Sequence, residues 1–537
     1  MAEPFKLLST LLFRWFLLPQ DTLILLPLWL VGRESRLGKA NKDSTPELTA
    51  GFHSEVCVFM RRLVKCSVLF AVFSVAFLRT NASAVVKLHS LFTDNMVLQQ
   101  GMRVPIWGEA DAGEKVTVEF LGQKVSAMPQ DGRWKLSLAP LSAGGPYVMK
   151  VTGSNTLELK NVMVGEVWFA SGQSNMAMAL KSCGAYAENT ISNAGKDDLR
   201  LYTVPRRTSP TPLLEAGGSW LVSSPETAQD FSAVAYWCGR YLKRALRVPV
   251  GLIDCSVGGS SAQAWMSREM FEPDARLKSI FLDRDHSKTG DIHKPMFLYN
   301  GMVASVIPYA IRGAIWYQGE SNCGAAYLYR DLFPALITGW RKQWGDGQFP
   351  FLFVQLAPYQ ADKRPELGDS YWAELREAQL LTLGKVPNSG MAVITDAGDL
   401  TDIHPKNKQP VGERLAKLAL DRAYAKRVAC ESPRYDSMQV KGNRIELKFR
   451  YAYGKLKSDG SALTGFSIAG EDRQFVWADA RITGKDTVEV SSASVAKPVA
   501  VRFGWSNFPQ LNLFNSVGLP ASPFRTDDWP VLSQEKT

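Results

Sequence analysis

The sequence predicts an α/β fold with a mainly parallel sheet, flanked by N-terminal and C-terminal β-sandwich-like domains. Between residues 163 and 427, strand-like apolar runs alternate with segments whose apolar residues repeat at helical spacing. Short alternating runs separated by turn residues occupy residues 85–162 and 428–537 instead. A chain of 537 residues is also too long for one ordinary core, so we expect several domains.

The N-terminal segment has the features of an export signal. From Met60 the sequence reads MRRLVKCSVLFAVFSVAFLRTNASA, a basic start, an apolar run and small residues that end at Ala84. This order predicts a signal peptide over residues 60–84 and a mature protein that is periplasmic or extracellular. Residues 1–59 precede this complete signal, and we interpret them as an untranslated or non-native extension.

A membrane segment within the extension is the alternative interpretation. The apolar stretch around LLPLWL is interrupted by Pro19, Asp21 and Pro27, well short of the roughly 20 apolar residues that a span requires. We therefore expect no stable membrane insertion after signal cleavage.

The domain at residues 85–162 is predicted to contain only strands. Its alternating runs are VPIWGEA, KVTVEFLG, KVSAMPQDGRWKLSL and YVMKVTGS, spaced by Gly, Asp and Asn. Such spacing is typical of a small sandwich.

The middle domain, residues 163–427, alternates strands with helices. The predicted strands are VGLIDCS, AIWYQGE, PFLFVQLA and MAVITDA, and the predicted helices are AVAYWCGRYLKRAL, LYRDLFPALITGWRKQW and WAELREAQLLTLG. After this domain, SMQVKGNRIELKFRYAY, GFSIAGEDRQFVWADARITG and DTVEVSSA predict strands again.

Four polar clusters follow strands of the middle domain. They are SGQSN after EVWFA, SVGGSSAQAW after GLID, QGESN after AIWY, and DAGDLTDIHP after MAVIT. Ligand sites of open parallel sheets form outside the carboxyl ends of the strands. The four clusters therefore predict one functional site at that edge.

Ser174 is the candidate nucleophile within the first cluster. The stretch FASGQSNMAM indicates a strand, a tight turn permitted by Gly172, and the first turns of a helix. A serine at such a turn presents its hydroxyl at the sheet edge. The alternative is a helix N-cap, the usual role of serine in this position.

His404 is the candidate base, because a serine nucleophile needs a neutral imidazole to take its proton. It follows a predicted strand and precedes a helix opened by Pro410. His293 is the alternative base. For the acid that orients the imidazole we favour Asp402. Its rivals are Asp399 and Asp396, and a turn or capping role is the alternative for each of the three carboxylates.

An oxyanion needs amide donors. Gly258 and Gly259 allow a backbone N–H to approach closely, and Gln318 or Asn322 offers a side-chain amide. Glu320 suggests a glycosidase acid, but such chemistry usually needs a second carboxylate and none accompanies it. We interpret Glu320 as a hydrogen-bonding residue that shapes the pocket.

Composition and cysteine spacing argue against several other classes. The net charge of +10 is partly due to the first 84 residues, and no basic cluster with interleaved aromatics follows, so we expect no nucleic-acid partner. The cysteines beyond residue 84 form no C-x-x-C pair, so we expect no metal and no cofactor. Their odd number leaves at least one free thiol and allows one disulfide. They are Cys183, Cys238, Cys255, Cys323 and Cys430.

Together these motifs resemble those of the sialate O-acetylesterase family, within the SGNH-type serine hydrolases. The resemblance rests on GQSNM, GGSSAQAW, LYNGMVASVIPYAIRGAIWYQGESN and DIHPKNK, and extends from LFTDNMVLQQ to GLPASPFRTDDWP. It implies a flavodoxin-like hydrolase core flanked by β-sandwich modules, and removal of acetyl esters from sialic acid or other acetylated glycans. It also implies that Ser174 is the nucleophile, that His404 is the base, and that Gly258 or Gly259 contributes to the oxyanion site.

The sequence departs from that pattern at two places. The wider superfamily often has its acid three residues before the histidine, where this chain has Thr401, so a Ser–His dyad remains an alternative to Asp402. In GGSSAQAW, relatives more often have a threonine and an acidic residue. Aromatic residues near the motifs either stack on sugars or pack in the core. They are Trp265, Trp316 and Tyr317.

Two other functions remain open at this point. One is a non-catalytic carbohydrate-binding cell-surface protein, and the other is a serine esterase that acts on another class of substrate. The presence of both Ser174 and His404 favours catalysis over the first of these.

Overall fold

A computed structural model describes residues 85–360, 367–460 and 462–534. The predicted extension and the predicted signal peptide, residues 1–84, lie outside the described residues. The described residues form one compact unit. In the part of the chain that the structure describes, no helix has the length and apolar character needed to cross a membrane.

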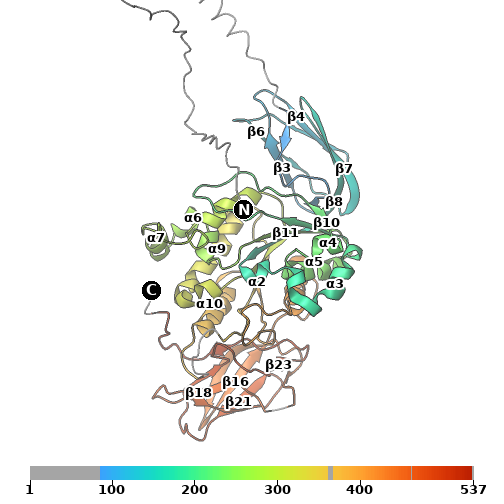
Figure 1. The fold of residues 1–537 in the computed structure, drawn as a ribbon. Helices are drawn as coiled ribbons and strands as arrows, with labels where there is room; N and C mark the ends of the chain where they lie inside the picture. The colour runs from blue at the N-terminus through green and yellow to red at the C-terminus, as the bar shows by residue number, and fades with distance from the viewer. Residues whose placement is uncertain (1–84, 361–366, 461, 535–537) are drawn as a thin grey trace, which may run out of the picture. The chain divides into compact units, whose positions relative to one another are not determined.

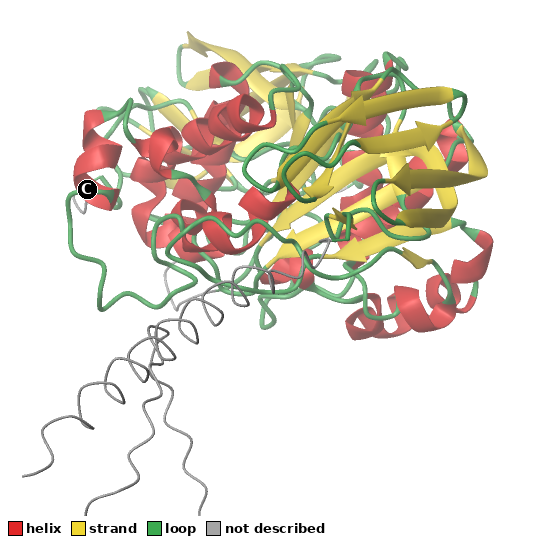
Figure 2. Cartoon of the chain, turned by 90° about the horizontal axis from the view of Figure 1, so that it is seen from above, coloured by secondary structure: helices red, strands yellow, loops and turns green. Residues whose placement is uncertain are grey.

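The N-terminal region is built from strands, as predicted (Figure 1). β1, β3 and β6 form a three-stranded antiparallel sheet. The other four strands belong to the large sheet. β2 and β7 pair with its strand β8 (Thr156–Gly172), β4 pairs with β7, and β5 pairs with β4. Figure 2 shows the strands and helices of the described residues from above. The strands are β1 (Lys87–Leu88), β2 (Val97–Gln99), β3 (Val104–Glu109), β4 (Val116–Phe120), β5 (Gln123–Ala127), β6 (Arg133–Leu138) and β7 (Gly144–Thr152).

One long strand, β8 (Thr156–Gly172), connects this region to the middle of the chain. Its first half alternates exposed and half-buried residues and pairs antiparallel with β7. Its second half is continuously buried and pairs parallel with β2 and with two strands of the middle region, as expected where both faces of a sheet are covered. The predicted strand EVWFA therefore lies near the end of a 17-residue strand, and the predicted boundary at residue 162 falls inside that strand.

The middle of the large sheet is parallel. Its strands lie in the order β9-β11-β8-β12-β13-β14, with β10 antiparallel at the β9 edge. Numbered along the chain, the path from β11 to β14 has the order 2-1-3-4-5, and β9 lies beyond it. These strands are β9 (Leu199–Thr203), β10 (Leu221–Val222), β11 (Val250–Ser256), β12 (Gly313–Tyr317), β13 (Phe351–Val354) and β14 (Ser389–Ala392).

Helices cover both faces of this parallel sheet (Figure 1). Trp168 and Ala170 of β8 are in the same buried cluster as α5 and α11, whereas Phe169 between them is in the cluster of α9 and α10. The four long helices agree with the predicted ones. They are α5 (Ala233–Leu246), α9 (Ala326–Trp344), α10 (Tyr371–Lys385) and α11 (Gln409–Tyr424).

Shorter helices fill the connections between these elements. They are α2 (Ser174–Ala177), η1 (Leu180–Tyr186), α3 (Glu188–Ser192), η2 (Ala194–Lys196), α4 (Pro225–Ala228), η3 (Ala262–Trp265), α6 (Arg268–Phe271), α7 (Ala275–Phe281), η4 (Tyr299–Val303), α8 (Ala304–Val306) and η5 (Glu320–Ala325).

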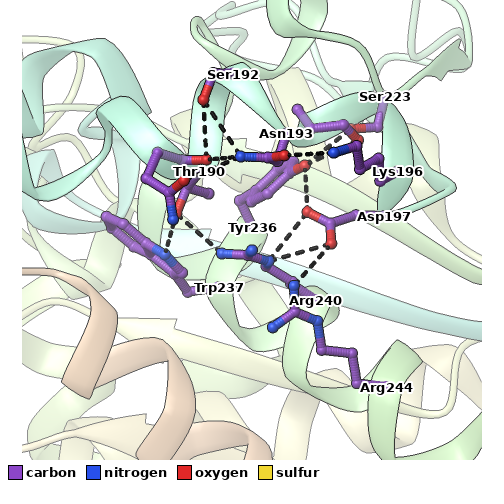
Figure 3. Close-up of polar contacts among 12 residues, drawn as sticks. Thr190, Ser192, Asn193, Lys196, Asp197, Ser223, Tyr236, Trp237, Arg240 and Arg244 are labelled. Carbon is purple, nitrogen blue, oxygen red and sulfur yellow. Dashed lines mark hydrogen bonds and ion pairs between the residues drawn. The ribbon is translucent and has the colours of Figure 1, made fainter.

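A buried polar network holds α5 in place (Figure 3). The Asp197 carboxylate, only 7% exposed, accepts hydrogen bonds from Tyr236 at 3.1 Å, Arg240 at 3.1 Å and Arg244 at 3.3 Å. Arg240 also donates to the Thr190 hydroxyl at 3.0 Å. Because a buried carboxylate requires such partners, the network fastens the segment around η2 to α5.

The residues at the start of α5 are hydrogen-bonded to α2 and to the residue that follows it. Ser232, the N-cap of α5, accepts from the amide of Ala235 and donates its hydroxyl to the carbonyl of Met176 at 2.7 Å. The amide of Ala233 donates to the carbonyl of Met178 at 2.8 Å. The turn that carries Ser174 is thus fixed from its C-terminal side by a long helix.

The C-terminal region returns to strands, as predicted. It contains the antiparallel sheets β15-β16-β21-β20 and β19-β18-β22-β24 and the pair β17-β23, around a core that includes Ile445, Phe466 and Phe503. The strands are β15 (Arg434–Lys441), β16 (Arg444–Arg450), β17 (Leu456–Lys457), β18 (Phe466–Ala469), β19 (Val476–Trp477), β20 (Asp479–Ile482), β21 (Thr487–Ser491), β22 (Ala500–Phe503), β23 (Phe514–Asn515) and β24 (Phe524–Arg525).

Candidate active site

The strand order predicts where a ligand binds. In the order 2-1-3-4-5 the sequence of strands reverses between β8 and β12, and ligands of such sheets bind outside the carboxyl ends at that switch point. Ser174 follows β8 directly, and the QGESN cluster follows β12. Two of the four predicted clusters therefore lie at the switch point itself.

Ser174 is the first residue of α2 and is not its cap. The N-cap position is occupied by Gln173, which makes no side-chain capping bond. Within the described residues the Ser174 hydroxyl makes no hydrogen bond, and the side chain is partly exposed. The N-cap alternative is therefore wrong, and the hydroxyl is free to meet a substrate.

The helix predicted to begin in FASGQSNMAM, over residues 174–181 (SNMAMALK), is also shorter than expected. α2 contains four residues and ends where Met178 becomes extended, at φ −61° and ψ 118°. A single turn contributes only a small dipole, so any anion at this place depends on individual amides rather than on a helix macrodipole.

Two glycines bring backbone close to Ser174. Gly172 has φ +139°, and a Cβ there would lie 2.1 Å from the carbonyl oxygen of Tyr317, so only glycine fits. A Cβ on Gly258 would lie 3.6 Å from the Cβ of Ser174. A Cβ on Gly259, which has φ +74°, would lie 3.5 Å from Cδ1 of Ile292 instead.

The backbone amides around Ser174 are available as donors. Within the described residues no hydrogen bond is made by the N–H groups of Ser174, Gly258 or Gly259. Because Gly258 lies against Ser174, its amide and that of Ser174 form the better pair for an oxyanion.

The side-chain amides of Gln318 and Asn322 differ in how many of their N–H groups have no hydrogen-bond partner. Gln318 donates one N–H to the carbonyl of Ser260 at 3.2 Å and the other to the Asn322 oxygen at 2.7 Å. Asn322 donates to Gln263 at 3.1 Å and has a second N–H without a partner among the described residues. Of the two predicted donors, Asn322 is the one that retains an N–H for an oxyanion.

His404 lies in the loop after β14, half-buried, with its side chain 40% exposed. Its Nδ1 is 3.7 Å from Asp402 Oδ1, and its backbone amide donates to the same oxygen at 2.8 Å. Burial lowers the pKa of His404 below 6.5, and the charge of Lys408 lowers it further, while Asp402 raises it. The imidazole is therefore neutral at pH 7, as a base requires.

The two rival carboxylates have other partners. Asp399 accepts from the backbone amides of Thr401 and Asp402, each at 2.9 Å, and shapes the loop. Asp396 forms a bidentate ion pair with Arg414, with both distances 2.6 Å. Asp402 is the predicted acid that lies beside the imidazole.

His293, the alternative base, is paired elsewhere. Its Nδ1 is 2.7 Å from the hydroxyl of Ser261. Ser261 is in the GGSSAQAW loop, so His293 supports that loop from the side. Nothing in this arrangement brings it to Ser174.

A buried polar chain lies directly behind Ser174. Asn175 is fully buried, and its amide nitrogen donates to Glu320 Oε1 at 2.5 Å and to the carbonyl of Ile403 at 3.0 Å. Its oxygen accepts a hydrogen bond from Lys408, whose side chain is almost completely buried. Glu320 thus supports Asn175, and its other oxygen is enclosed without a partner among the described residues.

Burial changes the ionisation of both ends of this chain. It lowers the pKa of Lys408 to about 8, with Glu320 acting in the opposite direction. It also raises the pKa of Glu320 above its usual value, an effect that the bond from Asn175 and the charge of Lys408 partly offset.

The aromatic residues near the motifs pack in the core rather than face a sugar. Trp265, Trp316 and Tyr317 have no exposed surface, and the rings of the two tryptophans are perpendicular at 6.2 Å. Stacking on a substrate is therefore excluded for all three. The five described cysteines are buried free thiols, so the disulfide that the sequence allowed is not formed.

Sequence reasoning missed Asn175, Lys408 and Gln173. Gln173 accepts at Oε1 from the amides of Gly319 and Ser321, both at 3.3 Å, and so ties the turn of Ser174 to the end of β12. All three lie within the motifs GQSNM and DIHPKNK. Their position within these two motifs is the sequence signal that could have identified them.

Comparison with known proteins identifies related esterases. Residues 164–421 match the family described as carbohydrate esterase, sialic acid-specific acetylesterase. Over 488 residues the chain is 30% identical to the sialate O-acetylesterases of Homo sapiens and Pongo abelii, covering 81% of this chain and 91% of each relative.

A solved structure is similar over most of the chain. It is the crystal structure of a carbohydrate acetylesterase from Xanthomonas citri, with 38% identity and a TM-score of 0.76. The match covers 83% of this chain and all of that one. On these relationships the chain is an esterase, a carboxylic ester hydrolase, and belongs to the sialate O-acetylesterase family.

Proposed function

We propose that this protein is an exported carbohydrate O-acetylesterase that uses Ser174 as nucleophile and His404 as base. The observation that carries the proposal is the hydrogen bond of 3.0 Å between the Asn175 side chain and the carbonyl of Ile403. It joins the residue after Ser174 to the residue before His404. Two segments that the sequence marked independently are thus in contact at the switch point of the sheet.

The proposed fold of the catalytic region is a flavodoxin-like SGNH core with β-sandwich-like domains on either side. The strand order 2-1-3-4-5 from β11 to β14, with helices on both faces, supports the core. The antiparallel sheets before and after it support the flanking domains.

The proposed mechanism is acyl transfer in two steps. Neutral His404 takes the proton of Ser174 as the hydroxyl oxygen attacks the acetyl carbonyl. The amides of Ser174 and Gly258 donate to the developing oxyanion, and Asn322 offers its free N–H. His404 then protonates the departing sugar oxygen, and it activates the water that releases acetate from Ser174.

Acetylated sugars are the proposed substrates because the relatives are named as sialate O-acetylesterases and as a carbohydrate acetylesterase. The test measures acetate released from p-nitrophenyl acetate, from O-acetylated sialic acid and from acetylated xylan. Release from at least one of the two glycan substrates is expected. Hydrolysis of the nitrophenyl ester alone would show an esterase of another substrate class, and no release from any of them would contradict the proposal.

Export is the part of the proposal that concerns residues 60–84. Cleavage after Ala84 would leave a mature protein that begins near Val85. N-terminal sequencing of protein secreted by its native host should return a start close to Val85. A secreted protein that retained residues before Met60 would overturn the assignment of the signal.

A further inference from the structure

Asn175 makes every hydrogen bond between the turn of Ser174 and the loop of His404. Within the described residues, no other residue of segment 173–178 is hydrogen-bonded to segment 396–408. The two segments follow β8 and β14, and β12 and β13 lie between those strands in the sheet. The hydrogen bonding between the nucleophile turn and the base loop therefore depends on one side chain.

The two ionisable groups around Asn175 determine the orientation of its amide. The oxygen faces the Lys408 ammonium and the nitrogen faces the Glu320 carboxyl, so the amide dipole lies between opposite charges. A rotated amide would direct its N–H groups at the ammonium and its oxygen at the carboxyl. Because that orientation is unfavourable, one N–H of Asn175 always faces the carbonyl of Ile403.

Stability alone does not explain why Lys408 and Glu320 are buried. Lys408 is 1% exposed and lies 5.3 Å from the centre of the Tyr317 ring, and Glu320 Oε2 is enclosed without a partner among the described residues. Buried charges are costly to desolvate and are often replaceable by apolar residues without loss of stability. An orienting role explains why they occur immediately behind a nucleophile.

We propose that Asn175 is a positioning residue for acyl transfer, which holds the His404 loop against the nucleophile turn while Lys408 and Glu320 fix the orientation of its amide. The proposal rests on the serine mechanism described above. Asn175 itself does not reach the substrate, because it is fully buried behind Ser174.

The first test is the Asn175→Asp variant. A carboxylate of the same shape still accepts from Lys408 but no longer donates to Ile403 or Glu320. A shift of about 1 Å between reacting groups costs about 10²-fold in rate, so kcat should fall by about that factor. KM should change by less than about threefold, because no contact with the substrate is lost. Labelling of Ser174 by a serine-directed organophosphonate should slow by a similar factor to kcat.

Asn515→Asp is the matched control. Asn515 is also fully buried, and it also donates two hydrogen bonds to backbone carbonyls, those of Glu431 and Tyr451, at 3.0 and 3.1 Å. It lies in β23 of the C-terminal region. This variant should melt at a lower temperature and retain the kcat of the parent. A purely structural role for Asn175 would make the two variants alike.

The second test uses the pH dependence of kcat. As pH rises through about 8, Lys408 loses its proton and the charge that orients Asn175 disappears, so kcat should fall on the alkaline side. The Lys408→Met/Glu320→Gln double variant keeps an acceptor for Asn175 and removes the two ionisable groups that are hydrogen-bonded to it. Its kcat should be flat between pH 7 and 9, at the level the parent reaches above pH 8. The groups that face Lys408 are Glu320, Tyr317, Cys183, Asp402 and His404.

These groups do not account for the alkaline limb. Burial raises the pKa of Cys183 to about 11 and that of Tyr317 well above 10, while His404 titrates below 6.5 and controls the acid limb. Removing Lys408 and Glu320 together also allows the test to proceed if Asn175→Asp does not fold. An alkaline limb that persists in the double variant contradicts the proposal.

The outcomes separate this inference from the proposed function. If the parent releases acetate and its Ser174 is labelled, the serine mechanism stands. Wild-type kcat and labelling rate in a folded Asn175→Asp protein would then contradict the positioning role alone. If Ser174 is neither labelled nor needed for turnover, both proposals fail together.

Discussion

Replacement of Ser174 by alanine is expected to lower kcat by about 10⁶-fold, the order seen when a serine nucleophile is removed. The covalent route disappears, and only substrate binding and the oxyanion donors remain. The free energy of unfolding should change by less than about 0.5 kcal/mol, because the hydroxyl makes no hydrogen bond within the described residues. An N-cap serine would instead cost about 1 kcal/mol on replacement by alanine.

The measurement combines thermal melting with acetate release from the best substrate of the parent. Ser192 provides a matched control, because it is also a helix serine and its hydroxyl bonds only locally, to the carbonyl of Asn189 at 3.2 Å and to Asn193. Ser192→Ala should leave both measurements unchanged. A Ser174→Ala protein that melts normally and releases acetate at the parent rate would remove Ser174 from the mechanism.

The part of the site that could be predicted from the sequence consists of residues that come directly after strands. The four clusters after EVWFA, GLID, AIWY and MAVIT follow real strands, and Ser174 and His404 come from two of them. The long helices were also predictable, because apolar spacing and local caps act in the same direction. α5 is an example, with a capping Ser232 and a buried face that includes Trp237 and Leu242.

Elements whose structure depends on distant partners were not predictable. β8 changes from alternating to continuous burial at residue 162, where its neighbours change, and no local signal marks a single strand across that point. The SNMAMALK segment contains good helix formers, but its helix ends after one turn. At that point its backbone carbonyls accept hydrogen bonds from Ser232 and Ala233 of the distant helix α5.

The polar interior of the site was the hardest part to predict. Lys408 is separated from Asn175 by 233 positions, and a lysine before an amphipathic helix is usually solvent-exposed. Gln318 and Asn322 have the same functional group four positions apart. Only the hydrogen bonds that each amide already makes show which one retains a free N–H.

The Asp402→Asn variant should lower kcat by up to about 10⁴-fold if Asp402 orients His404, as loss of a triad carboxylate can. Asparagine can still accept the backbone amide of His404, so the loop should keep its shape. What it loses is the negative charge 3.7 Å from Nδ1. Because that charge raises the pKa of His404, the acid limb of the kcat profile should move to lower pH in this variant.

Asp399→Asn is the control that distinguishes the imidazole from the loop. Asp399 accepts from the amides of Thr401 and Asp402 and does not contact His404 within the described residues. Its replacement should reduce thermal stability while kcat and the acid limb remain close to those of the parent. If Asp402→Asn instead keeps the parent kcat and the same acid limb, the enzyme is a Ser–His dyad, which Thr401 at the position of the usual acid would then explain. If the Asp399 change is the damaging one, the carboxylate acts through the loop, and the third catalytic residue has been assigned to the wrong aspartate.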